Sequence, residues 1–210
     1  MPFDRSGADL TAHALWAWWA WLQEVPDSLG RRVRRAMGKA LAYLRRVQRA
    51  DGSWAPLWFG NQFAETEDNL TYGTARVLIS LQAIEKDVAI DVSGMVDEGA
   101  KWLLAAQNED GGWQVRARAS IEETALAVTA LARLLGSGCR GVNRATVEEA
   151  VTKGTAWLIS HTEEGQRMGA APIGFYFSKL WYFEKLYPLI YTAGALEQVR
   201  QTMLFEDGGG

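Results

Sequence analysis

Two residues near the start of the chain, Asp9 and His13, have the types and the spacing that acid–base chemistry uses. Residues four apart lie on one face of a helix, so the carboxyl and imidazole groups can act together on a third group. A histidine cation would stabilise a neighbouring carboxylate and so strengthen an acid. From this pair alone, a structural explanation is preferred, in which Asp9 caps the helix and His13 is a packed side chain.

The sequence has few residues that could form disulfides or bind a metal ion. The chain has one cysteine, Cys139, and two histidines, His13 and His161, so we expect no disulfide framework, no thiolate zinc site and no other metal. A formal net charge of −3 gives no reason to expect a nucleic-acid partner. The N-terminal residues lack the pattern of a signal peptide, and no apolar stretch has the length of a membrane span. We therefore expect a cytoplasmic protein, soluble or bound to one membrane face.

The chain contains an internal repeat. Residues 39–54 align without gaps to residues 98–113, and each segment ends in Gln, Asp-Gly and Trp at the same spacing. A third copy at 153–165 keeps the first half but has Thr162 in place of the glutamine and Arg167 in place of the tryptophan. Repeats of this length indicate stacked supersecondary units.

Each repeat is predicted to be an amphipathic helix that ends at a turn, as at Asp51-Gly52. A second type of helix, apolar nearly all round, begins near residues 9, 70, 123 and 188 and is expected to be buried on both sides. Alternating outer and inner helices predict an all-α fold, an α/α toroid. It would occupy residues 1–205 as part of an α6/α6 barrel, followed by a flexible tail at 206–210.

The repeat resembles the QW motif of squalene–hopene and oxidosqualene cyclases, the class II terpene cyclases. The matching residues are the aromatic-Leu pair, Gln48 or Gln107, and Gly-x-Trp ending at Trp54 or Trp113. The resemblance covers nearly the whole chain and indicates the C-terminal part of such an enzyme. For the motif residues themselves we favour a purely structural role in joining neighbouring repeats.

The resemblance implies proton-initiated cyclisation of squalene or a related polyprenyl chain, an isomerase reaction that needs no metal or organic cofactor. In this family an Asp-x-Asp-Asp motif supplies the acid, and an Asp-x-x-x-His pair like Asp9 and His13 hydrogen-bonds it. No Asp-x-Asp-Asp occurs in this sequence. We expect the acid to come from an upstream segment and the isolated chain to be inactive.

The resemblance also implies aromatic cavity residues, because aromatic faces stabilise cations. Tyr72 matches a tyrosine near the acid, and Trp58 matches a cavity tryptophan. Phe175, Tyr176 and Phe177 resemble the C-terminal aromatic cluster of the family, although the usual lead-in is replaced by Ala171-Pro-Ile-Gly174. Ordinary core packing is the alternative for each of these aromatics.

Two charged segments have ordinary explanations. Glu65-Thr-Glu67-Asp68 could be imagined as a substitute acid, but a solvated helix cap is favoured. The arginines between Arg31 and Arg46 fit a solvated outer helix face, with contact to lipid headgroups as a minor alternative.

The sequence favours a cyclase portion that takes its apolar substrate at the inner membrane face and works with an N-terminal cyclase half. The alternative is a non-catalytic toroid module that binds apolar lipid or a partner protein. A protein prenyltransferase β-subunit is set aside, because Cys139 lacks the carboxylate two residues earlier that its zinc site would need.

Overall fold

The computed structural model describes residues 5–62, 64, 66–85, 90–114, 119–175 and 180–203, with the backbone alone for 171–175 and 180–182. Within these residues the chain forms helices and one pair of strands. The helices are α1 (Ala8–Trp21), α2 (Asp27–Val47), α3 (Leu70–Ile84), α4 (Ser93–Ala105), α5 (Ile121–Ser137), α6 (Arg144–His161) and α7 (Leu186–Met203). The strands are β1 (Ala171–Phe175) and β2 (Leu180–Glu184).

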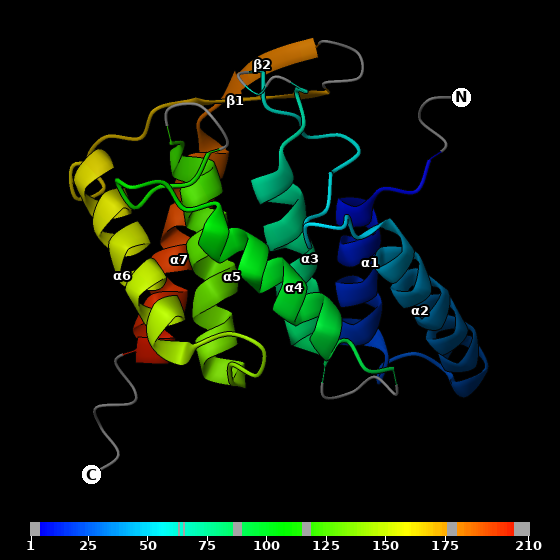
Figure 1. The fold of residues 1–210 in the computed structure, drawn as a ribbon. Coiled ribbons are helices and arrows are strands. Elements are labelled where there is room, and N and C mark those ends of the chain that lie inside the picture. Colours follow the sequence, from blue (N-terminus) through cyan, green and yellow to red (C-terminus); the bar gives the residue numbers. More distant parts are fainter. Residues whose placement is uncertain are drawn as a thin grey trace.

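The helices form two layers, as the repeat predicted. Helices α1, α3, α5 and α7 make the inner layer, in which each contacts the next, and α2, α4 and α6 lie outside them. The inner helices run in one direction, with their N-terminal ends toward the top of Figure 1. This arrangement confirms the all-α toroid.

The two strands were not expected. β1 and β2 pair in antiparallel register from Ala171↔Glu184 to Phe175↔Leu180, and the hairpin lies above the N-terminal ends of α3, α5 and α7 (Figure 1). The first strand contains Pro172 and Gly174, and both residue types normally weaken a strand prediction.

The inner helices differ in how completely they are buried. Most residues of α3 and α5 are buried, because each helix packs between two other inner helices. The end helices α1 and α7 have an inner neighbour on one side and keep large apolar side chains exposed: Leu10, Trp18, Trp21, Leu186, Leu189 and Ile190. The expectation of burial on both sides therefore holds for the central helices and is wrong for the end ones.

The glutamines of the repeat join successive outer helices. Gln48 Nε2 donates to the carbonyl of Gly52 in its own turn (3.0 Å) and to that of Met95 on α4 (3.1 Å). Gln107 repeats this pattern with Gly111 (2.9 Å) and Ala150 on α6 (3.0 Å). One side chain thus satisfies the turn that ends one helix and a carbonyl of the next helix.

The tryptophans of the repeat bind the outer helix before the turn and pack against the next outer helix, where Trp54 lies at Gly99 and Trp113 at Gly154. The Trp54 indole donates to the carbonyl of Leu44 (2.9 Å), and the Trp113 indole donates to that of Leu103 (2.8 Å). Both rings are fully buried. The structure therefore supports the role in joining repeats that the sequence favoured for these residues.

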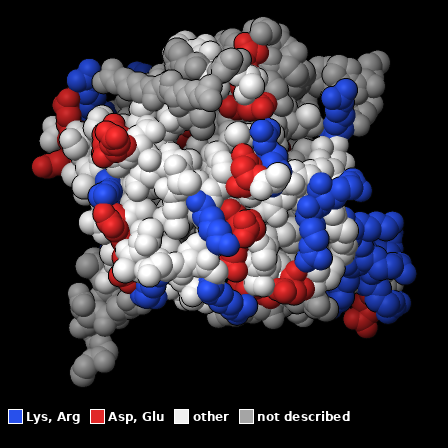
Figure 2. Space-filling view, in the orientation of Figure 1, with Lys and Arg blue, Asp and Glu red and all other residues white. Residues whose placement is uncertain are grey.

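Figure 2 shows Lys and Arg gathered at the lower right, over α2. Arg31, Arg32, Arg34 and Arg35 are exposed there, while Met37, Leu41 and Leu44 face the core. This matches the solvated face expected for an outer amphipathic helix. In the described parts of the chain, no helix combines the length and apolar character needed to cross a membrane.

Candidate functional site

The N-terminal ends of the inner helices carry most of the residues that could do chemistry. A Thr-Ala pair recurs on these helices at Thr11, Thr74, Thr124 and Thr192. Counting back two residues from the first three threonines gives Asp9, Tyr72 and Glu122. Asp9, Tyr72 and Glu122 therefore occupy equivalent positions on α1, α3 and α5, near the same end of the inner layer.

Asp9 is buried, with 1% of its surface exposed, and lies inside α1. The N-cap is Gly7, so the capping role that the residue type suggested for Asp9 is wrong. Asp9 Oδ1 accepts a 3.1 Å hydrogen bond from the backbone N–H of Leu57. Within the described residues Oδ2 has no hydrogen-bond partner, although it is buried. Burial raises the pKa of Asp9, against the opposing effects of backbone hydrogen bonds and of His13.

His13 lies on the same side of α1, but its ring does not meet the Asp9 carboxyl group. His13 Nδ1 is 3.4 Å from the backbone carbonyl oxygen of Asp9, and the ring accepts from the guanidinium of Arg76. Partial burial lowers the pKa of His13, and the Arg76 charge lowers it further. The expected histidine cation is therefore disfavoured in this chain, and Arg76 supplies the positive charge beside the ring.

Aromatic rings from a loop and two inner helices meet beside this pair. The Tyr72 ring lies 4.9 Å from that of Phe59, which lies 6.4 Å from Tyr187 in an edge-on arrangement. Tyr187 stacks on Tyr191 at 5.7 Å, and the Arg76 guanidinium lies 6.0 Å from the Tyr191 ring. We call Phe59, Tyr72, Tyr187 and Tyr191 the aromatic cluster.

Burial raises the pKa of Tyr72 and that of the partly buried Tyr191, which reaches about 12. Both phenols therefore stay protonated, and their rings remain neutral π-faces. Tyr72 is positioned by α3, since its backbone N–H donates to Oδ1 of the N-cap residue Asn69 at 2.9 Å.

Within the residues that it describes, the structure does not place the other aromatic residues suggested by the sequence in the aromatic cluster. Trp58 is half-buried in the loop before α3, and it is its neighbour Phe59 that contacts Tyr72. Phe175 ends strand β1, where only its backbone is described. Tyr176 and Phe177 lie outside the described residues.

A buried carboxyl group, Glu123, lies beneath the loop before α3. It accepts hydrogen bonds from the side-chain amides of Asn61 (2.8 Å) and Asn69 (3.2 Å). Burial raises the pKa of Glu123 to about 8, and the neighbouring Glu122 contributes. Glu123 therefore acts as a largely protonated link between the loop and α5.

Glu122 precedes it and is also buried, with 5% of its surface exposed. Burial raises the pKa of Glu122 to about 7, and the charge of Glu184 adds to the effect. The charge of Glu122 raises the pKa of both Tyr72 and Tyr191, so the Glu122 carboxyl group lies near the aromatic cluster.

The acidic segment before α3 does not form the expected cap. Glu65 lies outside the described residues. Asp68 pairs with Gly60 in an isolated bridge, and the N-cap of α3 is Asn69.

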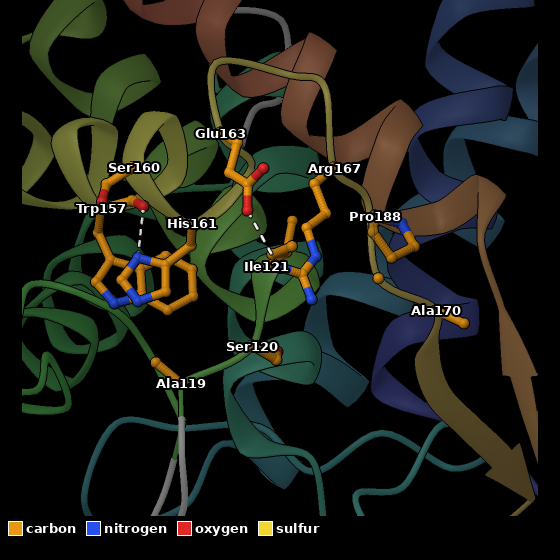
Figure 3. A pocket seen from close by; sticks show the side chains of 11 residues that line it. Ala119, Ser120, Ile121, Trp157, Ser160, His161, Glu163, Arg167, Ala170 and Pro188 are labelled. Atoms are coloured by element: carbon orange, nitrogen blue, oxygen red, sulfur yellow. Dashed lines mark hydrogen bonds and ion pairs between the residues drawn. The ribbon is translucent and has the colours of Figure 1, made fainter.

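A separate pocket of about 620 Å³ lies between the C-terminal end of α6 and the starts of α5 and α7. In Figure 3 His161 lies flat on Trp157, with ring centroids 3.8 Å apart, and Arg167 pairs with Glu163 at 3.1 Å. The charged groups of this pocket are thus already paired with each other. In the described parts of the chain, no three His, Cys, Asp or Glu residues gather as metal ligands would.

The profile of the family described as "Squalene-hopene cyclase C-terminal domain" matches residues 2–201. The chain belongs to this family. The match includes the repeats, the inner helices and the aromatic cluster.

Individual relatives of this squalene–hopene cyclase C-terminal domain include proteins named as cyclases and as synthases. The probable squalene–hopene cyclase of Sinorhizobium fredii is 37% identical over 120 residues, 54% of this chain and 16% of that protein. The copalyl diphosphate synthase of Streptomyces cyslabdanicus is 30% identical over 128 residues, 61% of this chain and 22% of that protein. Fungal proteins also match, such as the enfumafungin synthase of Hormonema carpetanum, 26% identical over 85% of this chain and 13% of its own length.

The solved structure of ent-copalyl diphosphate synthase from Streptomyces platensis has the same fold. It matches with a TM-score of 0.70 and 23% identity, over 93% of this chain and 34% of that protein. The domain thus spans a minor part of each of these relatives.

Sequence reasoning missed several residues near the site of this cyclase domain. Phe59, Arg76, Glu122, Tyr187 and Tyr191 were not among the candidate site residues. The sequence did contain a signal for Glu122, because aligning the Thr-Ala pairs of the inner helices gives it the same position as Asp9 and Tyr72. No comparable signal exists for Phe59, whose position depends on the path of a loop.

Proposed function

We propose that this chain is the C-terminal portion of a class II terpene cyclase that starts its reaction by protonating a polyprenyl substrate, squalene or a relative of it. A carboxylic acid from a segment outside this sequence would donate the proton. The residues of this chain would position that acid and line part of the cavity. The aromatic cluster at the N-terminal ends of the inner helices is the observation that carries the proposal.

Asp9 offers a place for the incoming acid. Its buried Oδ2 has no partner among the described residues, and a buried polar atom normally has one. A protonated carboxyl group could donate its hydrogen bond there. Arg76, which lies against His13, would then supply the positive charge that stabilises the carboxylate after the proton has left.

The aromatic cluster, together with Trp58 and residues 175–177, would shelter the carbocation that follows. A cation above a ring face is stabilised by about 0.5–2 kcal/mol, more when water is excluded. No step in this scheme requires a metal ion or an organic cofactor, because a Brønsted acid begins the reaction and the substrate supplies the remaining bonds.

The edge formed by α1 and α2 suits a preceding repeat, in the same polypeptide or in an N-terminal cyclase half. The Trp54 backbone N–H donates to Oγ1 of Thr74 on the following inner helix. By alignment, Thr11 holds the equivalent position on α1. The backbone of an upstream Gln…Gly-x-Trp turn would dock there.

Expression of the chain alone, and together with the acid-bearing part of a related cyclase, tests the proposal. Squalene and an acyclic prenyl diphosphate isomeric with copalyl diphosphate would be supplied, and products analysed by gas chromatography with mass spectrometry. We expect product only from the combination, and its loss on Asp9→Leu substitution. Cyclised product from the chain alone would contradict the proposal and point to an acid within it.

A different result would favour the non-catalytic alternative. If the combination gives no product but the chain binds squalene in vesicles, the toroid would be a lipid-binding module. Flotation with vesicles that contain anionic lipid would also test whether the arginine face of α2 brings the chain to a membrane surface.

A further inference from the structure

Glu122 has no assigned task in the proposed function, and its surroundings suggest one. Its side chain is 5% exposed, yet within the described residues it forms neither a hydrogen bond nor an ion pair. Burying a carboxyl group without a partner costs free energy, because the group loses its interactions with water. Buried groups of this kind are concentrated at functional sites.

Glu122 lies in the first turn of α5, near the aromatic cluster. It stands two residues before Thr124, as Asp9 stands before Thr11 and Tyr72 before Thr74. Glu123, by contrast, is held by two amides under the loop. The two adjacent glutamates therefore have different roles: one fixes the fold, and the other is left without a partner beside the aromatic cluster.

The groups that face Glu122 form a mostly neutral wall around its carboxyl group. Tyr72 on α3 and Tyr191 on α7 are uncharged phenols, and Glu184 at the end of β2 is a like charge. The cation of Arg76 lies against His13 and Tyr191. A carbocation on the substrate would thus meet π-faces and the carboxyl group of Glu122.

We propose that Glu122 is the base that ends the cyclisation in this cyclase. Its carboxylate takes a proton from the carbon next to the final cationic carbon. The electrons of that C–H bond form the alkene, and Glu122 becomes a neutral carboxylic acid. The proton then leaves to water beside Glu184, so no other reactant is needed. This inference rests on the proposed function, since it requires a carbocation in the cavity.

A stable mimic of the cation tests the first half of this inference on the chain itself. The probes are a prenyl chain ending in a tertiary amine, which is protonated at neutral pH, and the alcohol of the same length. Binding is followed by quenching of tryptophan fluorescence. We expect the amine to bind about tenfold more tightly than the alcohol, a difference of about 1.4 kcal/mol. This preference should weaken as the pH falls below the pKa of Glu122.

The isosteric variant Glu122→Gln should lose the preference for the amine and keep the affinity for the alcohol. Glu109→Gln, an exposed turn residue, is the matched control and should behave as the wild type. A preference retained in Glu122→Gln would overturn the inference and leave the cavity proposal intact. Binding of neither probe by the wild type would contradict the proposed function, and the inference with it.

Product analysis of the acid-complemented cyclase tests the proton transfer. In Glu122→Gln we expect substrate consumption within about tenfold of wild type. The share of deprotonated alkene should fall, and the share of alcohol formed by water capture should rise. Glu122→Asp should restore part of the alkene. An unchanged product distribution in an active Glu122→Gln enzyme would overturn the assignment.

Discussion

The backbone N–H of Trp54 donates a 3.0 Å hydrogen bond to Oγ1 of Thr74 on the following inner helix. Trp113 and Thr124 repeat this contact at 2.9 Å. Thr192 holds the equivalent place on α7, but its buried hydroxyl group has no partner in the described residues. The third repeat lacks the tryptophan that would dock there, since Arg167 stands in its place.

Thr74→Val should lower the free energy of unfolding by about 1–3 kcal/mol, because it leaves the buried Trp54 N–H without an acceptor. Thr192→Val should be neutral or stabilising, since it removes a buried hydroxyl group that is already unsatisfied. Urea unfolding of both variants measures the difference. Equal losses of stability would show that the repeat contact does not hold the inner layer together.

Gly99→Ala should destabilise α4 by about 1–3 kcal/mol through overpacking. A Cβ at Gly99 would come within 2.9 Å of the Trp54 ring and of a Leu78 methyl group. Gly94→Ala on the same helix is the matched control, because an added Cβ there meets nothing within 4 Å. Thermal unfolding should show a lower midpoint for Gly99→Ala and an unchanged or higher one for Gly94→Ala.

Stability should fall as the pH rises through neutrality. Burial raises the pKa of Glu122 to about 7 and that of Glu123 to about 8, both from 4.5. The folded state keeps these protons while the unfolded state releases them, so their stabilising effect is complete below pH 4.5 and is lost as the pH passes the folded-state values. The lowered pKa of His13 acts in the opposite direction below its ordinary value of 6.5.

Glu122→Gln isolates one part of this dependence. Relative to wild type it should gain about 3 kcal/mol between acid and mildly alkaline pH, at 1.36 kcal/mol for each unit of pKa shift. Urea unfolding at several pH values measures this gain, with Glu109→Gln as the control expected to follow the wild type. If the unfolding free energy of Glu122→Gln changed with pH as steeply as that of the wild type, the Glu122 carboxyl group would be solvated in the folded wild-type protein.

The isolated chain should self-associate, because α7 and the end of the hairpin expose neighbouring apolar side chains. These are Phe183, Leu186, Leu189 and Ile190. Exposed apolar patches of this kind favour association. Leu189→Ser combined with Ile190→Ser should reduce it, whereas Ile159→Ser on the outer helix α6 should not. Sedimentation velocity over a range of concentrations would show a monomer throughout if this expectation is wrong.

Periodicity was sufficient to predict the layers of this fold. The spacing of Gln48, Trp54, Gln107 and Trp113 fixed the repeat, and the apolar character of α3 and α5 marked them as inner helices. These features are local in the sequence, so they can be read without knowing how the helices pack. The hairpin was missed, because β1 contains Pro172 and Gly174 and is stabilised by pairing with β2 across the intervening residues.

The arrangement of the site residues depended more on tertiary contacts than the helical layers did. The chain alone indicated Asp9, His13 and Tyr72 as candidates, through their spacing and the family motif. Only the packed helices decided that Asp9 is buried with one unpartnered oxygen, that Arg76 lies against His13, and that Glu122 is near Tyr72. Burial and the approach of charges from separate helices set these properties, and neither is encoded in local spacing. Sequence thus specified which helices are built, and packing decided which side chains meet at their ends.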